Sequence, residues 1–362
     1  KQAEADTLLA DFSVEAEDTT IIDDNGGNGL ELETEYGYYT ILSTETGEVK
    51  DTSEKVIGRT LGATSHNYVW EEYTIGESGV LYDVWGTDEN NVYAVGGVRI
   101  NDTTYGVIHW DGTEWTPIAD AGGYAIYGFG EDDIWVAGGR VYHYDGNSWN
   151  RKDPSGSVLH ENVIYTCLWG TSSENLYFGN QGGKIVHWDG RRGKLADVQA
   201  SESFRDIYGL DANNIYAVTG ALFSQLSELY YFDGYIWKLL AIGTPNPTGD
   251  ELQSPFYTVW GYSNIIYFAG PILYRLANNK LRMEGRIGKN NVHGIAGTIL
   301  NNIFAVGTRR SISHYNGVDW YTFEDLIVTG ITLEHVWVTN NAAVAVGWDG
   351  VVSKIVVLKK DK

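Results

Sequence analysis

The stretch Tyr82–Gly97, YDVWGTDENNVYAVGG, combines an aromatic–glycine pair, a polar turn and a run of apolar residues. The chain then reads AIYGFGEDDIWVAGG from Ala125 and TCLWGTSSENLYFGN from Thr166, so that the glycine of the pair recurs every 42 residues, at Gly86, Gly128 and Gly170. Self-similarity at a fixed spacing of this size indicates a repeat architecture. The chain therefore has to be interpreted by aligning its copies.

The aromatic–glycine pair marks each copy of the repeat. It recurs at Trp85–Gly86, Tyr127–Gly128, Trp169–Gly170, Tyr208–Gly209 and Trp260–Gly261, with degenerate copies at Ala296–Gly297 and Trp337–Val338. Seven units of about forty residues thus fill the chain from about residue 66 to residue 360.

Each unit divides into four short strands. The aromatic–glycine strand is followed by a turn rich in Asp and Asn, then by a strand such as VYAVGG and a third such as GVIHWDG. The Asp-Gly that ends the third strand favours a tight hairpin, and Trp115, Trp149, Trp237 and Trp320 mark the fourth strand. Four antiparallel strands per unit predict an all-β, seven-bladed β-propeller.

The seventh unit lacks a fourth strand of its own. It ends at its third strand, SKIVVLK, whereas residues 67–75, NYVWEEYTI, resemble the fourth strands. We expect this N-terminal strand to complete the last blade, so that residues 66–362 form one closed propeller. Residues 1–65 lack the repeat and hold fifteen Asp and Glu against four Lys and Arg, which predicts a small β-module or an extended arm.

Composition limits the class of function. The formal net charge of −23 disfavours binding to nucleic acid or anionic lipid. No apolar run is long enough to span a bilayer, and a single cysteine allows no intramolecular disulfide. Strong acidity with many Trp, Tyr and Asn favours a secreted or bacterial cell-surface protein.

The segments VWGTDENNVYAVGG and GVIHWDGTEWTPI carry a resemblance to a known group. They are similar to the propeller repeats of bacterial extracellular surface proteins and lipoproteins, with a VWG–NDVYAVG–G-I-HYDG-W pattern. The resemblance covers about residues 64–360 and implies the propeller fold. It implies no catalytic residue set, because members of that group are generally of unknown function.

Several residue types recur at one place in successive units. A residue that repeats in this way is expected to be structural, because blade-equivalent positions lie too far apart to share one metal or substrate. The residues with this expected role are His109, His143, His187, His314, Trp85, Trp169, Trp260 and Trp337.

Binding residues are expected among the irregular ones, in the loops that gather over the propeller axis. Arg99, Arg140, Arg309, Arg310 and Trp348 follow second strands, so we predict that they face the axial mouth, where Arg with an aromatic suits an anionic or sugar ligand. Calcium is a candidate ligand of Asp23, Asp24 and Asn25 in DDNGGNG.

The favoured function is a non-enzymatic binding or assembly module that contacts a protein partner, or copies of itself, through its loops and residues 1–65. The alternatives are a carbohydrate-binding propeller and, third, a polysaccharide-acting enzyme with an axial site. No nucleophile elbow, phosphate loop, HExxH or CxxC motif occurs in the sequence.

Overall fold

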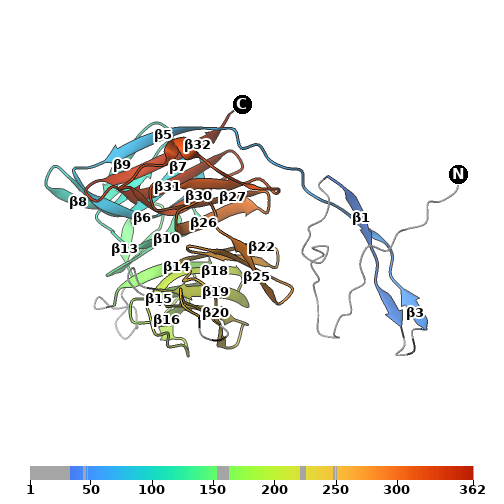
Figure 1. The fold of residues 1–362 in the computed structure, drawn as a ribbon. Coiled ribbons are helices and arrows are strands. Elements are labelled where there is room, and N and C mark those ends of the chain that lie inside the picture. The colour runs from blue at the N-terminus through green and yellow to red at the C-terminus, as the bar shows by residue number, and fades with distance from the viewer. Residues whose placement is uncertain are drawn as a thin grey trace. The chain divides into compact units, whose positions relative to one another are not determined.

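The computed structural model describes residues 33–43, 46, 48–152, 163–220, 226–247, 249 and 251–361. It divides into two compact units, residues 1–65 and residues 66–362. The larger unit consists of seven four-stranded antiparallel sheets, which confirms the predicted seven-bladed propeller (Figure 1).

The blades follow one another along the chain, and each is numbered from its innermost strand outward. Blade 1 has β6 (Ser78–Asp88), β7 (Asn91–Ile100), β8 (Thr103–Trp110) and β9 (Trp115–Ala119). Blade 2 has β10 (Ala125–Gly130), β11 (Asp133–Ala137), β12 (Val141–Tyr144) and β13 (Trp149–Arg151). Blade 3 has β14 (Tyr165–Ser172), β15 (Asn175–Asn180), β16 (Ile185–Trp188) and β17 (Gly193–Leu195). Blade 4 has β18 (Phe204–Asp211), β19 (Asn214–Thr219), β20 (Ser227–Phe232) and β21 (Trp237–Gly243).

The two blades that depart most from the repeat pattern are complete in the structure. Blade 5 has β22 (Thr258–Tyr262), β23 (Ile265–Ala269), β24 (Leu273–Ala277) and β25 (Lys280–Gly285). Blade 6 has β26 (Val292–Ile299), β27 (Asn302–Gly307), β28 (Ile312–Tyr315) and β29 (Trp320–Thr322), followed by the 3-10 turn η2 (Glu324–Leu326). In blade 5, Asn278 and Asn279 replace Asp-Gly, and both have positive φ (50° and 56°), as a two-residue hairpin turn with the strand twist requires.

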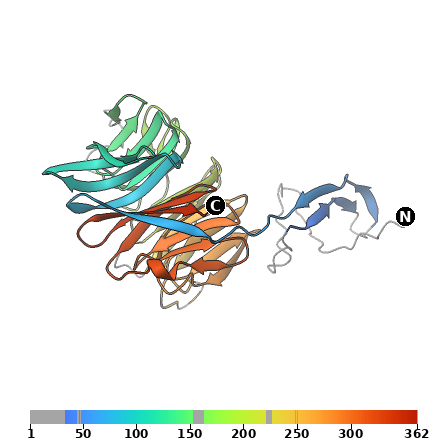
Figure 2. The same cartoon turned by 90° about the horizontal axis from the view of Figure 1, so that it is seen from above.

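Blade 7 closes the ring with a strand from the other end of the sequence. It is formed by β30 (Thr332–Val338), β31 (Ala342–Trp348), β32 (Ser353–Lys360) and β5 (Tyr68–Ile75). The last two strands pair over their full length, from Ser353 opposite Ile75 to Lys360 opposite Tyr68 (Figure 2). The sequence predicts this closure from the missing fourth strand. The innermost strands of successive blades contact one another around the axis, including β30 with β6.

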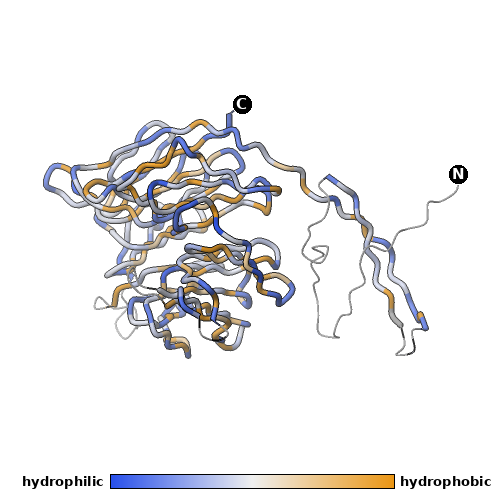
Figure 3. Tube along the Cα trace, viewed as in Figure 1, coloured by the Kyte–Doolittle hydropathy of each residue, from blue (hydrophilic) through white to orange (hydrophobic). Residues whose placement is uncertain are grey.

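Apolar side chains on both faces of the sheets fill the space between blades. Hydrophobic residues run through the propeller strands (Figure 3), and every residue of β23 and of β27 is buried. The core clusters join residues of neighbouring sheets, for example Trp135 of blade 2 with Phe178 and Trp188 of blade 3. Burying one such aromatic side chain contributes roughly 1.5–3 kcal/mol, so the interfaces between blades hold the ring together.

The aromatic–glycine pair is explained by contact between consecutive blades. Trp169 of blade 3 lies against Gly209 of blade 4, and a Cβ atom on that glycine would lie 2.3 Å from the indole. The same contact joins Trp85 to Gly128, Trp260 to Gly297 and, across the closure, Trp337 to Gly86. Each of these tryptophans therefore fits because the residue that it meets in the next blade is a glycine, which has no side chain.

The described residues of the smaller unit form two separate two-stranded sheets. One pairs β1 (Glu35–Tyr38) with β4 (Val56–Arg59), and the other pairs β2 (Ile41–Ser43) with β3 (Val49–Thr52). Nearly every strand residue there is exposed, including Ile57 at 65%. Two-stranded ribbons of this kind have little stability by themselves in water.

Replacing Gly209 by alanine is expected to destabilise the propeller by about 1–3 kcal/mol, because the added methyl overlaps the Trp169 indole. The matched control is Gly97→Ala in β7, where a Cβ atom would meet no atom within 4 Å. Urea unfolding of both variants checks this. Equal stabilities would contradict the packing role of the glycine.

Deleting residues 1–65 is expected to leave a folded, monomeric propeller, because β5 and all the blades remain. Deleting residues 1–75 removes β5 and is expected to abolish cooperative unfolding, since β32 loses the partner strand along which it pairs. Size-exclusion chromatography and thermal denaturation distinguish the two deletion variants. A propeller that survives the longer deletion would disprove the closure.

Candidate functional site

A cavity of about 550 Å³ runs along the propeller axis and is lined by the innermost strand of every blade. Aligning the seven strands on the aromatic–glycine position gives three levels of side chains. Each level contains one residue from each blade. Residues that differ between the repeats therefore lie at equivalent positions around the axis.

The first level, which we name the polar tier, lies where the innermost strands begin. Its members are Tyr82, Tyr124, Thr166, Arg205, Tyr257, His293 and Glu334. In five blades the strand pairing skips this residue: Tyr82, Thr166, Arg205, His293 and Glu334 each fall in a register shift. A β-bulge re-aims a side chain that regular pairing would direct elsewhere, so the bulges deliver these groups to the axis.

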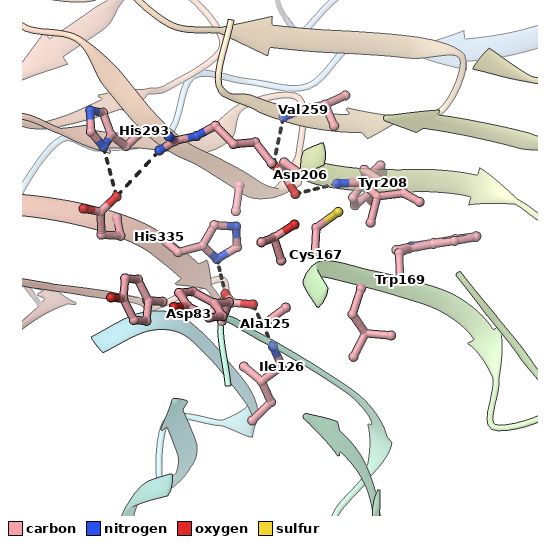
Figure 4. A pocket seen from close by; sticks show the side chains of 18 of the residues that line it. Asp83, Ala125, Ile126, Cys167, Trp169, Asp206, Tyr208, Val259, His293 and His335 are labelled. Carbon is pink, nitrogen blue, oxygen red and sulfur yellow. Dashed lines mark hydrogen bonds and ion pairs between the residues drawn. The ribbon is translucent and has the colours of Figure 1, made fainter. Parts of the chain in front are cut away.

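An ion-pair network joins three members of the polar tier. His293 Nδ1 lies 3.0 Å from Glu334 Oε2, and an Arg205 guanidinium nitrogen lies 3.8 Å from the same oxygen (Figure 4). Burial alone would raise the pKa of Glu334, but the hydrogen bond and charge of His293, the charge of Arg205 and a hydrogen bond from Trp348 hold it below its usual value. Glu334 is therefore a carboxylate at neutral pH.

Aromatic side chains surround this network. The Arg205 guanidinium lies over the Tyr257 ring at 5.0 Å, and the rings of Tyr82 and Tyr124 are 4.6 Å apart. Burial is the main cause that raises the pKa of Tyr82 and of Tyr257. These phenols therefore stay protonated and can donate hydrogen bonds.

The second level, the middle tier, follows directly in each strand. Its members are Asp83, Ala125, Cys167, Asp206, Thr258, Gly294 and His335. Its polar members bond the next blade: Asp83 accepts the amide of Ile126 at 2.9 Å, and Asp206 accepts the amide of Val259 at 2.9 Å (Figure 4). These carboxylates connect neighbouring blades at the wall of the cavity.

His335 is the cation of the middle tier. Its Nδ1 lies 2.6 Å from Asp83 Oδ1, as an ion pair whose angle falls outside hydrogen-bond geometry. The side chain is 30% exposed, but the exposed part faces the enclosed cavity. Burial lowers the pKa of His335, yet the carboxylates of Asp83, Asp206 and Glu334 outweigh it and raise the pKa to about 9.

Cys167 and Asp206 share the middle tier with His335. Burial, reinforced by the charges of Asp206 and Asp83, raises the pKa of the Cys167 thiol well above its usual value. Burial also raises the pKa of Asp206, against the opposing charge of His335. Cys167 is therefore a protonated thiol at neutral pH rather than a reactive thiolate.

The third level, the aromatic tier, consists of the repeat aromatics and their one small replacement. Its members are Trp85, Tyr127, Trp169, Tyr208, Trp260, Ala296 and Trp337. Four of these are the tryptophans for which the sequence predicts a structural role, and each packs against the glycine of the next blade.

The repeat histidines are placed in the blades, outside the residues that line the cavity. Each donates from Nε2 to the side-chain oxygen at the start of the second strand and stacks on an aromatic ring of that strand. The pairs are His109 with Asn91 at 2.7 Å, His143 with Asp133 at 2.9 Å, His187 with Asn175 at 2.7 Å and His314 with Asn302 at 3.2 Å. In blade 4, Tyr231 occupies the position and bonds Asn214 at 2.9 Å.

The four arginines predicted to face the axis are not among the described residues that line the cavity. They are Arg99, Arg140, Arg309 and Arg310. Arg99 is half exposed and pairs with Asp102, three residues away in the same hairpin. Arg309 is exposed in the turn after β27, and Arg140 lies in the turn between β11 and β12.

Arg310 is buried and holds the closing strand. Its Nε donates to the Leu326 carbonyl at 2.6 Å, its Nη1 pairs with Glu72 of β5, and the guanidinium lies 5.7 Å from the centre of the Trp70 ring. Its contacts stabilise the closure rather than the axial mouth.

Trp348 is the one residue of the predicted binding set with a contact to the polar tier. It ends β31 and hydrogen-bonds Glu334. The calcium candidates Asp23, Asp24 and Asn25 lie outside the described residues. Within the described ranges, no group of three or more His, Cys, Asp or Glu side chains is arranged to hold a metal ion.

The sequence contained a signal for the axial residues that loop-based reasoning missed. Arg205, Asp206, Glu334 and His335 are ionisable residues at positions of the first strand where several other blades have uncharged ones, such as Thr166 and Ala125. A charged residue in the innermost strand indicates either a polar bond between blades or a ligand-binding site. Aligning the repeats shows that these four residues occupy two equivalent positions, one next to the other.

Comparisons with solved structures agree on the fold. The chain is similar to a structure described as YCF48 bound to D1 peptide, at 12% identity and a TM-score of 0.61, over 83% of this chain and 99% of that one. It is also similar to YCF48 from Cyanidioschyzon merolae, at 15% identity and 0.56, over 79% and 98%. A third match is the WD40 propeller domain of Doa1, at 12% and 0.57, over 83% and 99%.

At these identities the likeness shows a seven-bladed β-propeller and no narrower relationship. No protein-family model and no curated protein sequence matches the chain. The resemblance to bacterial surface repeats therefore stays a prediction. Within the described residues, no helix has the length and hydropathy needed to cross a membrane.

The His335–Asp83 pair is expected to make stability depend on pH. The pKa of about 9 in the folded state lies above the ordinary 6.5, so the stabilisation is complete below pH 6.5 and is lost as the pH rises through 9. We expect wild type to lose on the order of 2 kcal/mol of unfolding free energy between pH 6.5 and 9.5.

Urea unfolding across that pH range, with wild type and His335→Gln, measures the effect. The unfolding free energy of His335→Gln should not show this fall with rising pH. The matched repeat variant His187→Gln should show the same fall as wild type, because burial lowers the pKa of His187. The same slope in His335→Gln and wild type would show that another group titrates.

Proposed function

We propose that the chain is a non-catalytic binding module of a secreted or cell-surface protein, and that it holds a segment of a protein partner in the axial cavity. The observation that carries the proposal is the polar tier. Seven equivalent strand positions present five kinds of side chain, and bulges direct five of the seven residues toward the axis. A rigid scaffold with varied residues at one concave place is the usual form of a binding site.

The chemistry of the other conspicuous residues supports a binding role. The repeat histidines are engaged in bonds inside their blades, and Cys167 is a neutral thiol, so these groups are used for packing and orientation. One of the similar propellers is described as bound to a peptide, which shows that this architecture accommodates such a ligand in that protein.

The proposal places the partner on the axis rather than on the four loop arginines. Arg99 and Arg310 already have carboxylate partners within the chain. Residues 1–65 remain a candidate second contact, because the described ribbons there expose Val56, Ile57 and other apolar side chains.

A displayed library of random peptides, selected on the full chain, tests the proposal. Selected peptides should bind wild type and lose at least about tenfold in affinity with Tyr124→Ala, which removes one aromatic side chain from the polar tier. The matched control is Tyr235→Ala, because Tyr235 is 91% exposed in the hairpin between β20 and β21 and distant in sequence from the tier.

Equal binding by Tyr124→Ala and wild type would reject the axial location. Failure to select any peptide, together with binding on a glycan array, would reject the protein partner and establish the carbohydrate alternative.

A further inference from the structure

We propose that Arg205 binds a carboxylate of the partner polypeptide, supplied either by its C-terminus or by an Asp or Glu side chain. This inference rests on the proposed function and names the chemical group that the axial site recognises. It follows from the missing hydrogen-bond acceptors of the Arg205 guanidinium among the described residues and from the contacts that Glu334 makes with other groups.

Arg205 is aimed at the cavity by its backbone. It is the residue skipped in the pairing of β18 with β19, between Phe204 and Asp206. Its side chain is 20% exposed and lines the axial cavity, and the guanidinium is held over the Tyr257 ring at 5.0 Å. An oriented, largely buried guanidinium loses little further freedom when it binds a ligand.

The donors of Arg205 are not satisfied by the described residues. Within the described residues its ion-pair partner is Glu334 Oε2 at 3.8 Å, which is too long for a hydrogen bond. A guanidinium carries five N–H donors, and a cation withdrawn from bulk water requires compensation. Arg310 shows the contrast, because it donates to a carbonyl at 2.6 Å and also pairs directly with Glu72.

Glu334 does not fill this role because it is engaged by other groups. Its Oε2 lies 3.0 Å from His293 Nδ1, and Trp348 is among the groups that lower the pKa of this carboxyl. A ligand carboxylate can therefore approach Arg205 without breaking a hydrogen bond. Glu334 remains a nearby negative charge that opposes this approach, so its removal should tighten binding.

Three tyrosines of the same cavity add donors that suit the same ligand. Tyr82, Tyr124 and Tyr257 line the cavity with Arg205, Tyr257 in contact with the guanidinium, and within the described part of the chain their phenol oxygens have no hydrogen-bond partner. Phenol O–H groups donate well to carboxylate oxygens. A guanidinium in a cavity lined by such donors suits a planar anion with two oxygens.

The arrangement of the rings favours a polypeptide over a sugar. Sugars commonly bind by stacking on an exposed aromatic face, and each of these rings already has a neighbour on one face: Tyr82 packs on Tyr124 at 4.6 Å, and Tyr257 carries the guanidinium at 5.0 Å. Oligosaccharides that contain uronic acid carry the same carboxylate and are therefore tested as an outcome.

The experiment uses peptides selected on the full chain, synthesised in four forms. These have a free C-terminus, an amidated C-terminus, Asp and Glu replaced by Asn and Gln, and both changes together. Fluorescence polarisation gives the Kd of each form for wild type. Neutralising one of the two carboxylate sources, the C-terminus or the acidic side chains, should weaken binding at least about tenfold. The peptide with both changes should bind no more tightly than the weaker of the two singly changed peptides.

Variants of the chain assign this loss to Arg205. Arg205→Gln should bind the carboxylate form at least about tenfold more weakly and should no longer distinguish it from the neutral form. Arg205→Lys should recover part of the affinity, and Glu334→Gln should bind several-fold more tightly than wild type. The matched control, Arg99→Gln, should not differ from wild type. Thermal unfolding identifies any variant that fails to fold, and Arg205→Lys then decides the question.

Selected peptides whose binding is independent of their carboxylates and of Arg205 would overturn this inference and leave the proposed function standing. Absence of any selected peptide would overturn both. Arg205-dependent binding of uronate oligosaccharides, without peptide binding, would overturn the assignment to a polypeptide.

Discussion

The contact of each blade with its two neighbours is the constraint on which the rest of the structure depends. A four-stranded sheet has two apolar faces, and only another blade can cover each of them. The indole of Trp169 over Gly209 and that of Trp337 over Gly86 are instances of one contact that passes from blade to blade. The same contact must join the seventh blade to the first. The ring of interfaces is therefore complete only when β5 pairs with β32 in the seventh blade.

The same constraint explains where chemical variety is tolerated. Positions that face a neighbouring blade are repeated as aromatic, glycine or apolar residues, since a change there disturbs two sheets at once. Positions that face the axis meet neighbouring blades through individual polar contacts rather than this close packing, and their occupants range from Thr166 to Arg205 and Glu334. A bulge at the start of the innermost strand separates the two kinds of position by redirecting one side chain.

Sequence patterns predict most of this architecture because the features involved are local. The Asp-Gly turns, the tryptophans that open the fourth strands and the unpaired strand near Trp70 each follow from a few adjacent residues. The axial site was not predictable in the same way. That Arg205 faces the axis depends on a register shift between β18 and β19, and no local residue pattern specifies that shift. Arg310 was predicted at the mouth but is buried against Glu72, a contact between residues 238 positions apart in sequence.

The pairing of β5 with β32 has a mechanical consequence. The two strands are antiparallel, and Tyr68 stands opposite Lys360 at the same end of the pair. Tension applied through the segments next to these two residues would load one rung of the ladder at a time, so the strands would peel apart instead of sliding as a block. The Glu72 contacts with Arg310 and Lys354 lie partway along this path and would arrest peeling after the first few rungs.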